Sequence, residues 1–387
     1  MKYFSHLNSA IQILEKYKGS EPFAHFIKNY FRQYKKFGST DRRTISHFCY
    51  SYFRIGNALK NVSIEERILT GIFLCNHSSN DLLAHFKPDW NNKIHLSLAE
   101  KLSLINSHFS VQVIFPWKDE LSDGVDHEKF SESFFIQPDL FLRIRPGKKE
   151  MVLKKLTDAK IEFKQINNSC IALNNSTKIE DVIQINTEAV IQDYNSQQIR
   201  NFFEPQTTNH KAQTAWDCCA ASGGKSIMLY DINPNIKLTV SDIRESILMN
   251  LKKRFEEAGI KKYHSFVCDL STTNYKPQTT NYNLIIADVP CTGSGTWSRT
   301  PESLLFFSKS EIERYSELQK KIVANIIPSL SKNGKLVYIT CSVFKKENEE
   351  MVDFILQKFP LQLEKMEVLK GYEMKADTMF AASFISK

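Results

Sequence analysis

The sequence has few of the features that mark secreted, membrane-spanning or zinc-binding proteins. No apolar run exceeds four residues, so we expect no membrane span. The first residues, MKYFSHLNSAIQILEKYKG, lack the unbroken apolar core of a signal peptide. The eight cysteines include no C-x-x-C pair, which argues against a zinc site, and we expect no metal. We therefore expect a cytoplasmic protein with reduced thiols.

Internal repeats and low-complexity tracts are also missing, so the chain reads as an ordinary globular protein. Its 387 residues suffice for two or three domains, and 42% are hydrophobic while 24% are charged. The net charge of +8 favours a polyanionic partner, although a solvated lysine-rich surface would give the same composition. Charge alone therefore leaves the partner open.

The periodicity of apolar residues divides the chain into three predicted domains. Residues 1–130 show helical spacing, as in AIQILEKY and HFIKNYFRQY. Residues 131–205 mix strand-like and helical segments and form a predicted small α+β unit. Residues 206–387 alternate strands and helices, which predicts a Rossmann-like, doubly wound α/β domain with a mostly parallel sheet. Such sheets bind ligands at the carboxyl ends of their strands.

A candidate cofactor site follows the first strand of the α/β domain, in the segment DCCAASGGKS. The segment is neither a P-loop nor a G-x-G-x-x-G motif, and a plain tight turn would explain its glycines equally well. Three further strands each end in an aspartate, and any one of these could be a helix cap. Together they favour a nucleoside-containing cofactor, S-adenosylmethionine rather than a dinucleotide. The expected contacts are Cys219, Ala220, Ala221, Ser222, Gly223, Gly224, Lys225, Asp242, Asp269 and Asp288.

Two cysteines lie just after predicted strands of the same domain. Cys291 stands in DVPCTGSG, and Cys341 stands in YITCSVF. A buried, inert cysteine is the common explanation for either one alone. If the two strands are neighbours, their ends lie roughly 5 Å apart, and both thiols can reach one substrate ring.

These motifs resemble those of the Nop/Sun family of RNA cytosine-5 methyltransferases. DCCAASGGKS is similar to the cofactor loop of that family, and DVPCTGSGTWSRTPE and YITCSVFKKENEE are similar to its two cysteine motifs. PDLFLRIRP and STDRRTISHFCYSYFR resemble parts of the bacterial branch that modifies 16S rRNA. The resemblance implies a NusB-like helical domain, a small RNA-recognition-like unit and S-adenosylmethionine as cofactor. Ser222 and Trp297 depart from the proline and the smaller aliphatic residue usual in the family.

The resemblance also implies a covalent mechanism in which two thiols serve one cytosine. A thiolate that adds to C6 activates C5 toward a methyl group on a sulfonium. DNA cytosine methyltransferases attack from a Pro-Cys motif, which would nominate Cys291, whereas the RNA family attacks from Thr-Cys. We therefore expect Cys341 to be the nucleophile and Cys291 to assist its release, with Asp288 stabilising the proton at N3.

The expected function is S-adenosylmethionine-dependent methylation of C5 of a cytosine in structured RNA, most readily 16S rRNA, by a monomeric enzyme. Methylation of tRNA is one alternative. A second is a methyltransferase-fold RNA-binding or ribosome assembly factor whose catalytic residues are dispensable. A third is an amino-directed methyltransferase, but Asp-Val-Pro-Cys lacks the aromatic residue that often holds an amine there.

Overall fold

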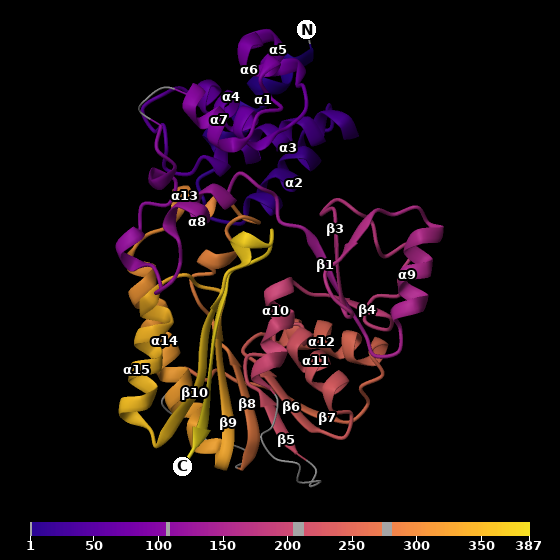
Figure 1. Cartoon of the computed structure of the whole chain (residues 1–387), viewed down its shortest axis with the longest axis vertical. Helices are drawn as coiled ribbons and strands as arrows, with labels where there is room; N and C mark the ends of the chain where they lie inside the picture. Colours follow the sequence, from indigo (N-terminus) through magenta and orange to yellow (C-terminus); the bar gives the residue numbers. More distant parts are fainter. Residues whose placement is uncertain (1, 106–108, 204–212, 273–280) are drawn as a thin grey trace. The chain divides into compact units, whose positions relative to one another are not determined.

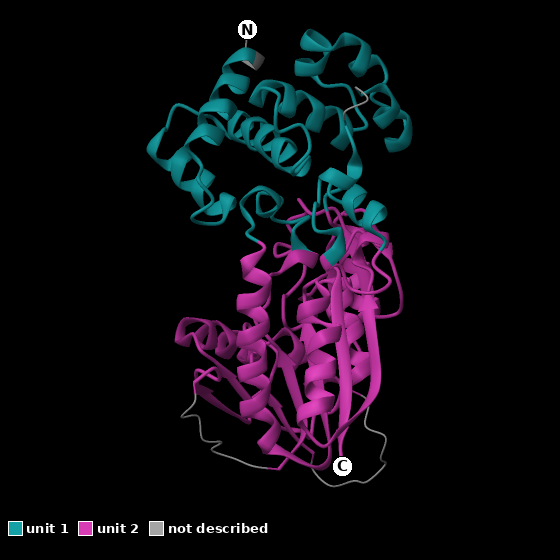
Figure 2. Cartoon of the chain, turned by 90° about the vertical axis from the view of Figure 1, so that its left-hand side faces the viewer, with its two compact units in different colours: residues 1–119, 126–137, 296–308 teal, residues 120–125, 138–295, 309–387 magenta. Residues whose placement is uncertain are grey.

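A computed structural model describes residues 2–105, 109–203, 213–272 and 281–387. They divide into two compact units, drawn in different colours in Figure 2. One unit holds residues 1–119, 126–137 and 296–308, and is called the helical unit below. The other holds residues 120–125, 138–295 and 309–387, and is called the α/β unit. The three-domain division drawn from the sequence stays a prediction.

The helical unit confirms the helical character expected for the N-terminal region. Its helices present apolar faces inward, as α3 does with Ile45, Phe48 and Phe53. Ser97 begins α7 with a capping box, because its hydroxyl accepts from Glu100 N while Glu100 accepts from Ser97 N. No helix in the described ranges has the length and apolar character that a membrane crossing requires. The helices are α1(Lys2–Lys16), α2(Phe23–Gln33), α3(Ser39–Arg54), α4(Ile64–Cys75), α5(Asp81–Phe86), α6(Pro88–Asn92), α7(Leu98–Leu104), α8(His127–Ser133) and α13(Ser303–Phe306).

The α/β unit begins with a small antiparallel sheet of order β2-β3-β1-β4. Its central strand β1 pairs with β3 on one side and β4 on the other. The helix that follows β1 packs its buried residues Val152 and Leu156 into the core of this sheet. The elements are β1(Leu140–Ile144), α9(Lys149–Asp158), β2(Phe163–Gln165), β3(Cys170–Leu173) and β4(Ala189–Ile191).

A seven-stranded sheet of order β10-β11-β9-β8-β5-β6-β7 forms the larger part of the α/β unit (Figure 1). The strands from β9 to β7 pair in parallel, and β10 and β11 add an antiparallel edge. The Rossmann-like α/β fold predicted for this region is thereby confirmed. The elements are α10(Tyr194–Gln198), β5(Thr214–Asp217), α11(Gly224–Ile232), β6(Lys237–Asp242), α12(Glu245–Glu257), β7(Tyr263–Val267), β8(Tyr282–Asp288), α14(Ser310–Ile326), β9(Leu330–Thr340), α15(Glu349–Lys358), β10(Leu361–Leu369) and β11(Met379–Ser386).

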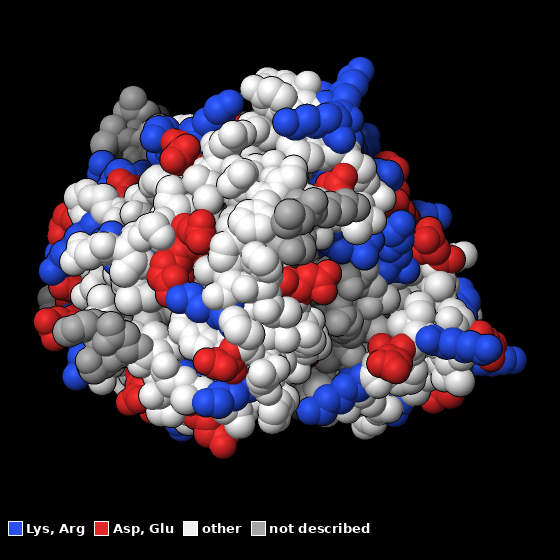
Figure 3. Space-filling view, turned by 90° about the horizontal axis from the view of Figure 1, so that it is seen from above, with Lys and Arg blue, Asp and Glu red and all other residues white. Residues whose placement is uncertain are grey.

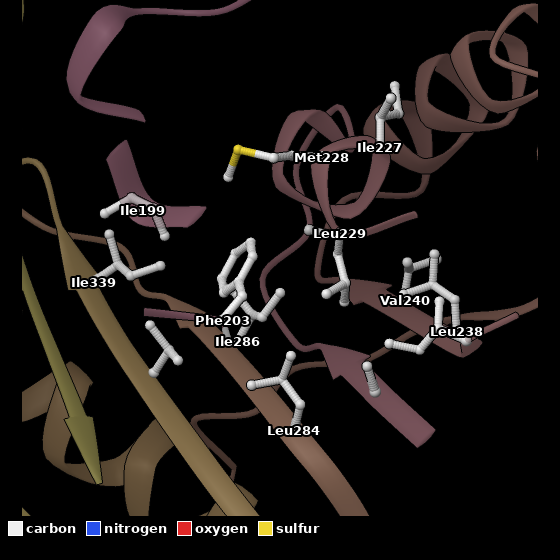
Figure 4. Packing of buried hydrophobic residues seen from close by; sticks show 14 of the residues in the cluster. Ile199, Phe203, Ile227, Met228, Leu229, Leu238, Val240, Leu284, Ile286 and Ile339 are labelled. Atoms are coloured by element: carbon white, nitrogen blue, oxygen red, sulfur yellow. The ribbon is translucent and has the colours of Figure 1, made fainter. Parts of the chain in front are cut away.

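Most residues of the central strands β5, β6, β8 and β9 are buried, as expected for parallel strands covered on both faces, whereas the edge strands β7 and β10 are largely exposed. On one face, Ile286 belongs to the same cluster as Leu229 of α11 (Figure 4). Phe255 of α12 is a further member of this cluster. On the other face, Ile285 packs with Val323 of α14 in a second cluster. Figure 1 shows α11 and α12 on one side of the sheet and α14 and α15 on the other.

The alternation of side chains along β8 and β9 brings the candidate catalytic residues to one face. Asp288 follows Ile286 by two positions, and Cys341 follows Ile339 by two, while Ile286 and Ile339 share one core cluster. Asp288 pairs with Ile339 in the parallel β8–β9 ladder, and Cys341 itself packs against that cluster. The aspartate and the cysteine therefore meet at the carboxyl ends of two neighbouring strands.

A buried ion-pair cluster joins the small sheet to the large one. Arg143 and Arg145 on and after β1 both bind Asp231 of α11, with N–O distances of 2.5 and 2.7 Å. The Asp231 side chain is only 6% exposed, so the cluster is shielded from solvent. Arg145 also donates to the carbonyl of Ala258, at the end of α12. These ion pairs and this hydrogen bond thus attach the small sheet to α11 and to the end of α12.

We predict that Asp231→Ala destabilises the chain by about 3–5 kcal/mol, because it leaves two buried guanidinium groups without their carboxylate. The measurement is the free energy of unfolding from urea denaturation. Asp158→Ala, an exposed change at the end of α9, is the matched control and should cost no more than about 0.5 kcal/mol. Equal stability of the two variants would show that the cluster does not hold the sheets together.

Candidate functional site

The predicted cofactor loop runs from the end of β5 to the start of α11 and has an unusual backbone. Ala221 and Gly223 adopt left-handed conformations, with φ of 45° and 82°. A Cβ at Gly223 would lie 2.7 Å from Cε1 of Phe255, so only glycine fits this conformation and this space. A Cβ at Gly224, in contrast, would meet no atom within 4 Å. The start of α11 therefore opens onto free space, where backbone N–H groups can face a ligand.

The aspartates at the end of β6 and after β7 are held by different segments, Asp242 by the predicted cofactor loop and Asp269 by the turn after β7. Asp242 accepts a hydrogen bond from Ala221 N at 3.0 Å and is 6% exposed. Asp269 accepts from the N–H and the hydroxyl of Ser271 at 2.8 and 2.6 Å. Both carboxylates keep further lone pairs for ligand hydroxyl or amino groups. Their roles in binding stay predictions.

Ser222, the departure from the family pattern, is bound by a residue of the neighbouring helix. Arg254 of α12 donates to the Ser222 carbonyl at 2.9 Å and to its hydroxyl at 2.6 Å. A proline at this position would keep the first of these bonds and lose the second. The serine thus ties the loop to α12 by a charge-assisted hydrogen bond.

A buried acid lies beneath the loop. Asp217 is 1% exposed, and its Oδ2 accepts from the Ser226 hydroxyl at 2.6 Å. Its Oδ1 has no hydrogen-bond partner among the described residues. Burial raises the pKa of Asp217 from 3.8 to about 7. A loop that holds a polar ligand needs open space and polar atoms whose hydrogen bonds are not yet satisfied. The space at Gly224 and Oδ1 of Asp217 meet these two requirements, so these residues fit a nucleoside cofactor.

Lys225 and Asp288 form an ion pair between the start of α11 and the end of β8. Their Nζ–Oδ2 distance is 2.7 Å, and 11% of the lysine and 29% of the aspartate side chain is exposed. Burial alone would lower the pKa of Lys225, but Asp288, Asp217 and Cys341 raise it above its ordinary value. Lys225 therefore holds its positive charge beside Asp288 and within electrostatic reach of Cys341.

The two motif cysteines are neighbours. The Sγ atoms of Cys291 and Cys341 lie 3.3 Å apart, and both residues are half-buried. The hydrogen bond to Cys341 and burial raise the pKa of Cys291. Gly295 holds the Cys291 loop close, because its N–H donates to the Cys341 carbonyl at 2.9 Å. A Cβ at Gly295 would lie 2.0 Å from the carbonyl oxygen of Thr378, so a larger residue would push the loop away.

A polar network that the sequence analysis did not identify locks the two cysteine loops together. Glu347 accepts from the N–H and the hydroxyl of Thr292 at 2.9 and 2.5 Å, and from the hydroxyl of Ser342. Thr292 and Ser342 are the residues directly after the two cysteines. The side-chain amide of Gln319 in α14 adds a fourth donor at 3.1 Å. Burial raises the pKa of Glu347, although these hydrogen bonds act to lower it.

Trp297, the second departure, is part of the helical unit. Its indole is 3% exposed and packs against Phe115, Trp117 and Phe307, with ring centroids 5.9, 5.8 and 4.8 Å apart. The segment that follows the Cys291 loop thus contributes to the aromatic core of the helices.

In the part of the chain that the structure describes, no three His, Cys, Asp or Glu side chains gather as metal ligands.

We predict that Glu347→Ala destabilises the chain by about 2–4 kcal/mol, because it leaves buried donors on Thr292, Ser342 and Gln319 without an acceptor. Glu350→Ala, an exposed change on α15, is the matched control and should be near neutral. Urea denaturation compares the two. A loss as small as that of the control would mean that the network contributes nothing to holding the loops.

A second prediction concerns pH. Because the folded state binds a proton at Asp217 more tightly than the unfolded state, this group stabilises the fold fully below pH 3.8, and the contribution is lost as pH rises through about 7. Asp217→Asn removes this titration. The free energy of unfolding of the D217N protein minus that of the wild type should therefore rise from pH 4 to pH 7. A difference that stays constant with pH would contradict the raised pKa.

The chain is similar to known proteins in sequence and in fold. It is 28% identical over 168 residues to Ribosomal RNA small subunit methyltransferase B of Yersinia enterocolitica, a match that covers 43% of this chain and 38% of the relative. The chain thus matches less than two thirds of that relative's length. The crystal structure of PH0851 has the same fold over 100% of this chain and 98% of its own, with a TM-score of 0.70 and 18% identity.

A third similarity is to NSun6 from Pyrococcus horikoshii, with a TM-score of 0.57 and 13% identity over 67% of this chain and 94% of that one. The profile of the 16S rRNA methyltransferase RsmB/F family matches residues 172–384, more than half of the chain. This match covers the cofactor loop and both cysteine motifs, and it confirms the resemblance drawn from them. The chain belongs to the 16S rRNA methyltransferase RsmB/F family.

Proposed function

We propose that this chain transfers a methyl group from S-adenosylmethionine to C5 of a cytosine in 16S rRNA. The observation that carries the proposal is the 3.3 Å separation of two thiols beside the Lys225–Asp288 ion pair. Both pairs lie at the carboxyl ends of β8 and β9, next to the glycine-rich loop. An inert structural role explains neither the buried lysine beside a cysteine nor the second thiol.

The residues that would hold the cofactor are the loop from Cys219 to Lys225 and the acids Asp242 and Asp269. When bound, S-adenosylmethionine supplies an electrophilic methyl group on a sulfonium. The NSun6 structure, which shares the fold, contains SFG, an analogue of this cofactor. Asp242 would accept hydrogen bonds from the ribose hydroxyls, and the uncapped start of α11, with open space at Gly224, supports binding of the ligand there.

Cys341 is the proposed nucleophile. Its thiolate adds to C6 of the cytosine and forms an S–C6 bond, and the C5–C6 electron pair becomes available to take up the methyl group at C5. Loss of H5 as a proton then returns an electron pair to C5–C6 and expels Cys341 as a thiolate. The positive charge of Lys225 lies within electrostatic reach of the Cys341 sulfur in the first and the last of these steps.

Asp288 and Cys291 serve the steps before and after methyl transfer. Asp288 stabilises the proton at N3 while Cys341 adds, and Lys225 holds its carboxylate in position at 2.7 Å. Cys291 holds its proton because its pKa is raised, so its S–H can donate a hydrogen bond to the Cys341 sulfur as that sulfur leaves as a thiolate. A water molecule held beside Cys291 takes up H5 in the same step.

An RNA substrate is supported by the relatives and by charge. The curated relative carries ribosomal RNA in its name, and the chain has a net charge of +8. A thiol and a cofactor methyl group cannot both reach C5 and C6 of a stacked, paired cytosine. The target base must therefore be unpaired or rotated out of its helix, at a cost of a few kcal/mol.

We predict opposite outcomes for the two cysteines. Cys341→Ala should lower methyl transfer by about 10⁴-fold or more, because the nucleophile is lost. Cys291→Ala should accumulate a covalent RNA–protein adduct that a denaturing gel resolves, because release fails. Cys75→Ala, in α4 of the helical unit, is the control and should change neither readout. An adduct with the Cys341 variant in place of the Cys291 variant would reverse the two roles.

Bisulfite sequencing of RNA from cells with and without the gene tests substrate and reaction together. We expect loss of 5-methylcytosine at a 16S rRNA position, restored by the wild-type gene and not by Cys341→Ala. Loss at a tRNA position would replace the substrate. If loss of the gene changes no methylated position, and the Cys341→Ala variant restores growth or ribosome assembly, a non-enzymatic assembly factor is favoured.

A further inference from the structure

A basic cavity lies in the α/β unit between the small sheet and α11, apart from the cysteines. Its volume is about 390 Å³. Its lining includes four cationic side chains and one carboxylate, which are Arg143, Arg145, Lys149, Arg200 and Asp231. The remaining lining residues are uncharged. We refer to this site as the basic cavity.

Asp231 offsets only one of these four positive charges, and both of its oxygens are already bound by two of the arginines. Arg143 takes Oδ2 at 2.5 Å, and Arg145 takes Oδ1 at 2.7 and 3.0 Å. Lys149 binds only the neutral Asn168, at 3.0 Å, and Arg200 is exposed with no carboxylate partner among the described residues. The cavity therefore carries a surplus of positive charge that an anion would balance.

The buried arginine of the cavity also has unused hydrogen-bonding capacity. The Arg143 side chain is 7% exposed, yet its Nη2 has no hydrogen-bond partner within the described ranges. Buried N–H donors are rarely left in this state. Burial lowers the pKa of Arg143, and the charges of Arg145 and Arg200 lower it further, whereas Asp231 acts to raise it. A bound anion would relieve this repulsion.

The start of α9 adds a further positive contribution. This ten-residue helix begins at Lys149, and its first turn has no side-chain cap. Its free N–H groups and its dipole favour an anion at this end. Arginine and lysine together with a helix start make up the donor set that phosphate oxygens prefer.

We propose that the basic cavity binds a backbone phosphate of the RNA substrate. The proposal rests on the proposed function for its RNA, and it adds a contact outside the reacting residues. On the face drawn in Figure 3, Lys and Arg side chains are interspersed with Asp and Glu over the described residues.

The test compares two double variants that remove the same charge. Lys149→Gln with Arg200→Gln removes two of the four positive charges of the cavity. Lys154→Gln with Lys164→Gln removes two positive charges from exposed lysines of α9 and the small sheet outside the cavity. Fluorescence anisotropy measures the affinity of each full-length protein for labelled, in vitro-transcribed 16S rRNA from about 50 to 300 mM salt. Over such a range, the affinity of a protein that makes several phosphate contacts falls by roughly a thousandfold or more. The negative slope of log affinity against log salt should become shallower by about 1 to 2 for the cavity variant. The control slope should stay within about 0.5 of the wild type.

The same experiment separates the possible outcomes. Equal slopes for the two double variants would overturn the proposal. Calorimetry with inorganic phosphate gives a second outcome that would overturn it. If the wild type binds phosphate and the cavity variant does not, but the salt slope of RNA binding is the same for both, the cavity binds free phosphate and not the RNA backbone. In methyl transfer, the cavity variant should raise KM and keep kcat. A wild type that binds RNA but transfers no methyl group would refute the proposed function and leave the cavity result standing.

Discussion

The pairing of β8 with β9 is the constraint on which the rest of the site depends. The two strands run in parallel, with Asp288 opposite Ile339, so both loops that carry cysteines leave the same edge of the sheet. Only this register lets the two sulfurs approach to 3.3 Å while the aspartate meets Lys225. A shift by one residue would turn Asp288 to the face of α14 and α15, away from the lysine.

Two polar clusters turn this register into a fixed arrangement. Glu347 binds the residues that follow both cysteines and buries four hydrogen bonds between the loops. Asp231, at the other side of the domain, binds two arginines of the small sheet and so builds one wall of the basic cavity. The first cluster fixes the two cysteine loops relative to each other, and the second holds together one wall of the cavity that we propose for an RNA phosphate. Both are costly to break because their members are buried.

The sequence predicted the features that follow from local pattern. Alternating strands and helices gave the parallel sheet, and the aspartates and cysteines at strand ends gave the candidate site. Contacts between distant segments were out of reach: nothing local indicates that Glu347 binds Thr292, or that Trp297 belongs to the aromatic core of the helices. Strand β10 was also not predicted, because its sequence LQLEKMEVL lies at the edge of the sheet, is mostly exposed and lacks a regular alternation of apolar and polar residues.

The central claim is that Cys341 forms the bond to the cytosine. It is tested most directly with an RNA substrate that carries 5-fluorocytosine at the target position, since fluorine at C5 cannot leave as a proton and the adduct persists. Mass spectrometry of the digested adduct then identifies the linked residue. The account predicts RNA attached to the peptide with Cys341. Attachment to the peptide with Cys291, or methylated product from normal RNA with no adduct on either cysteine, would contradict it.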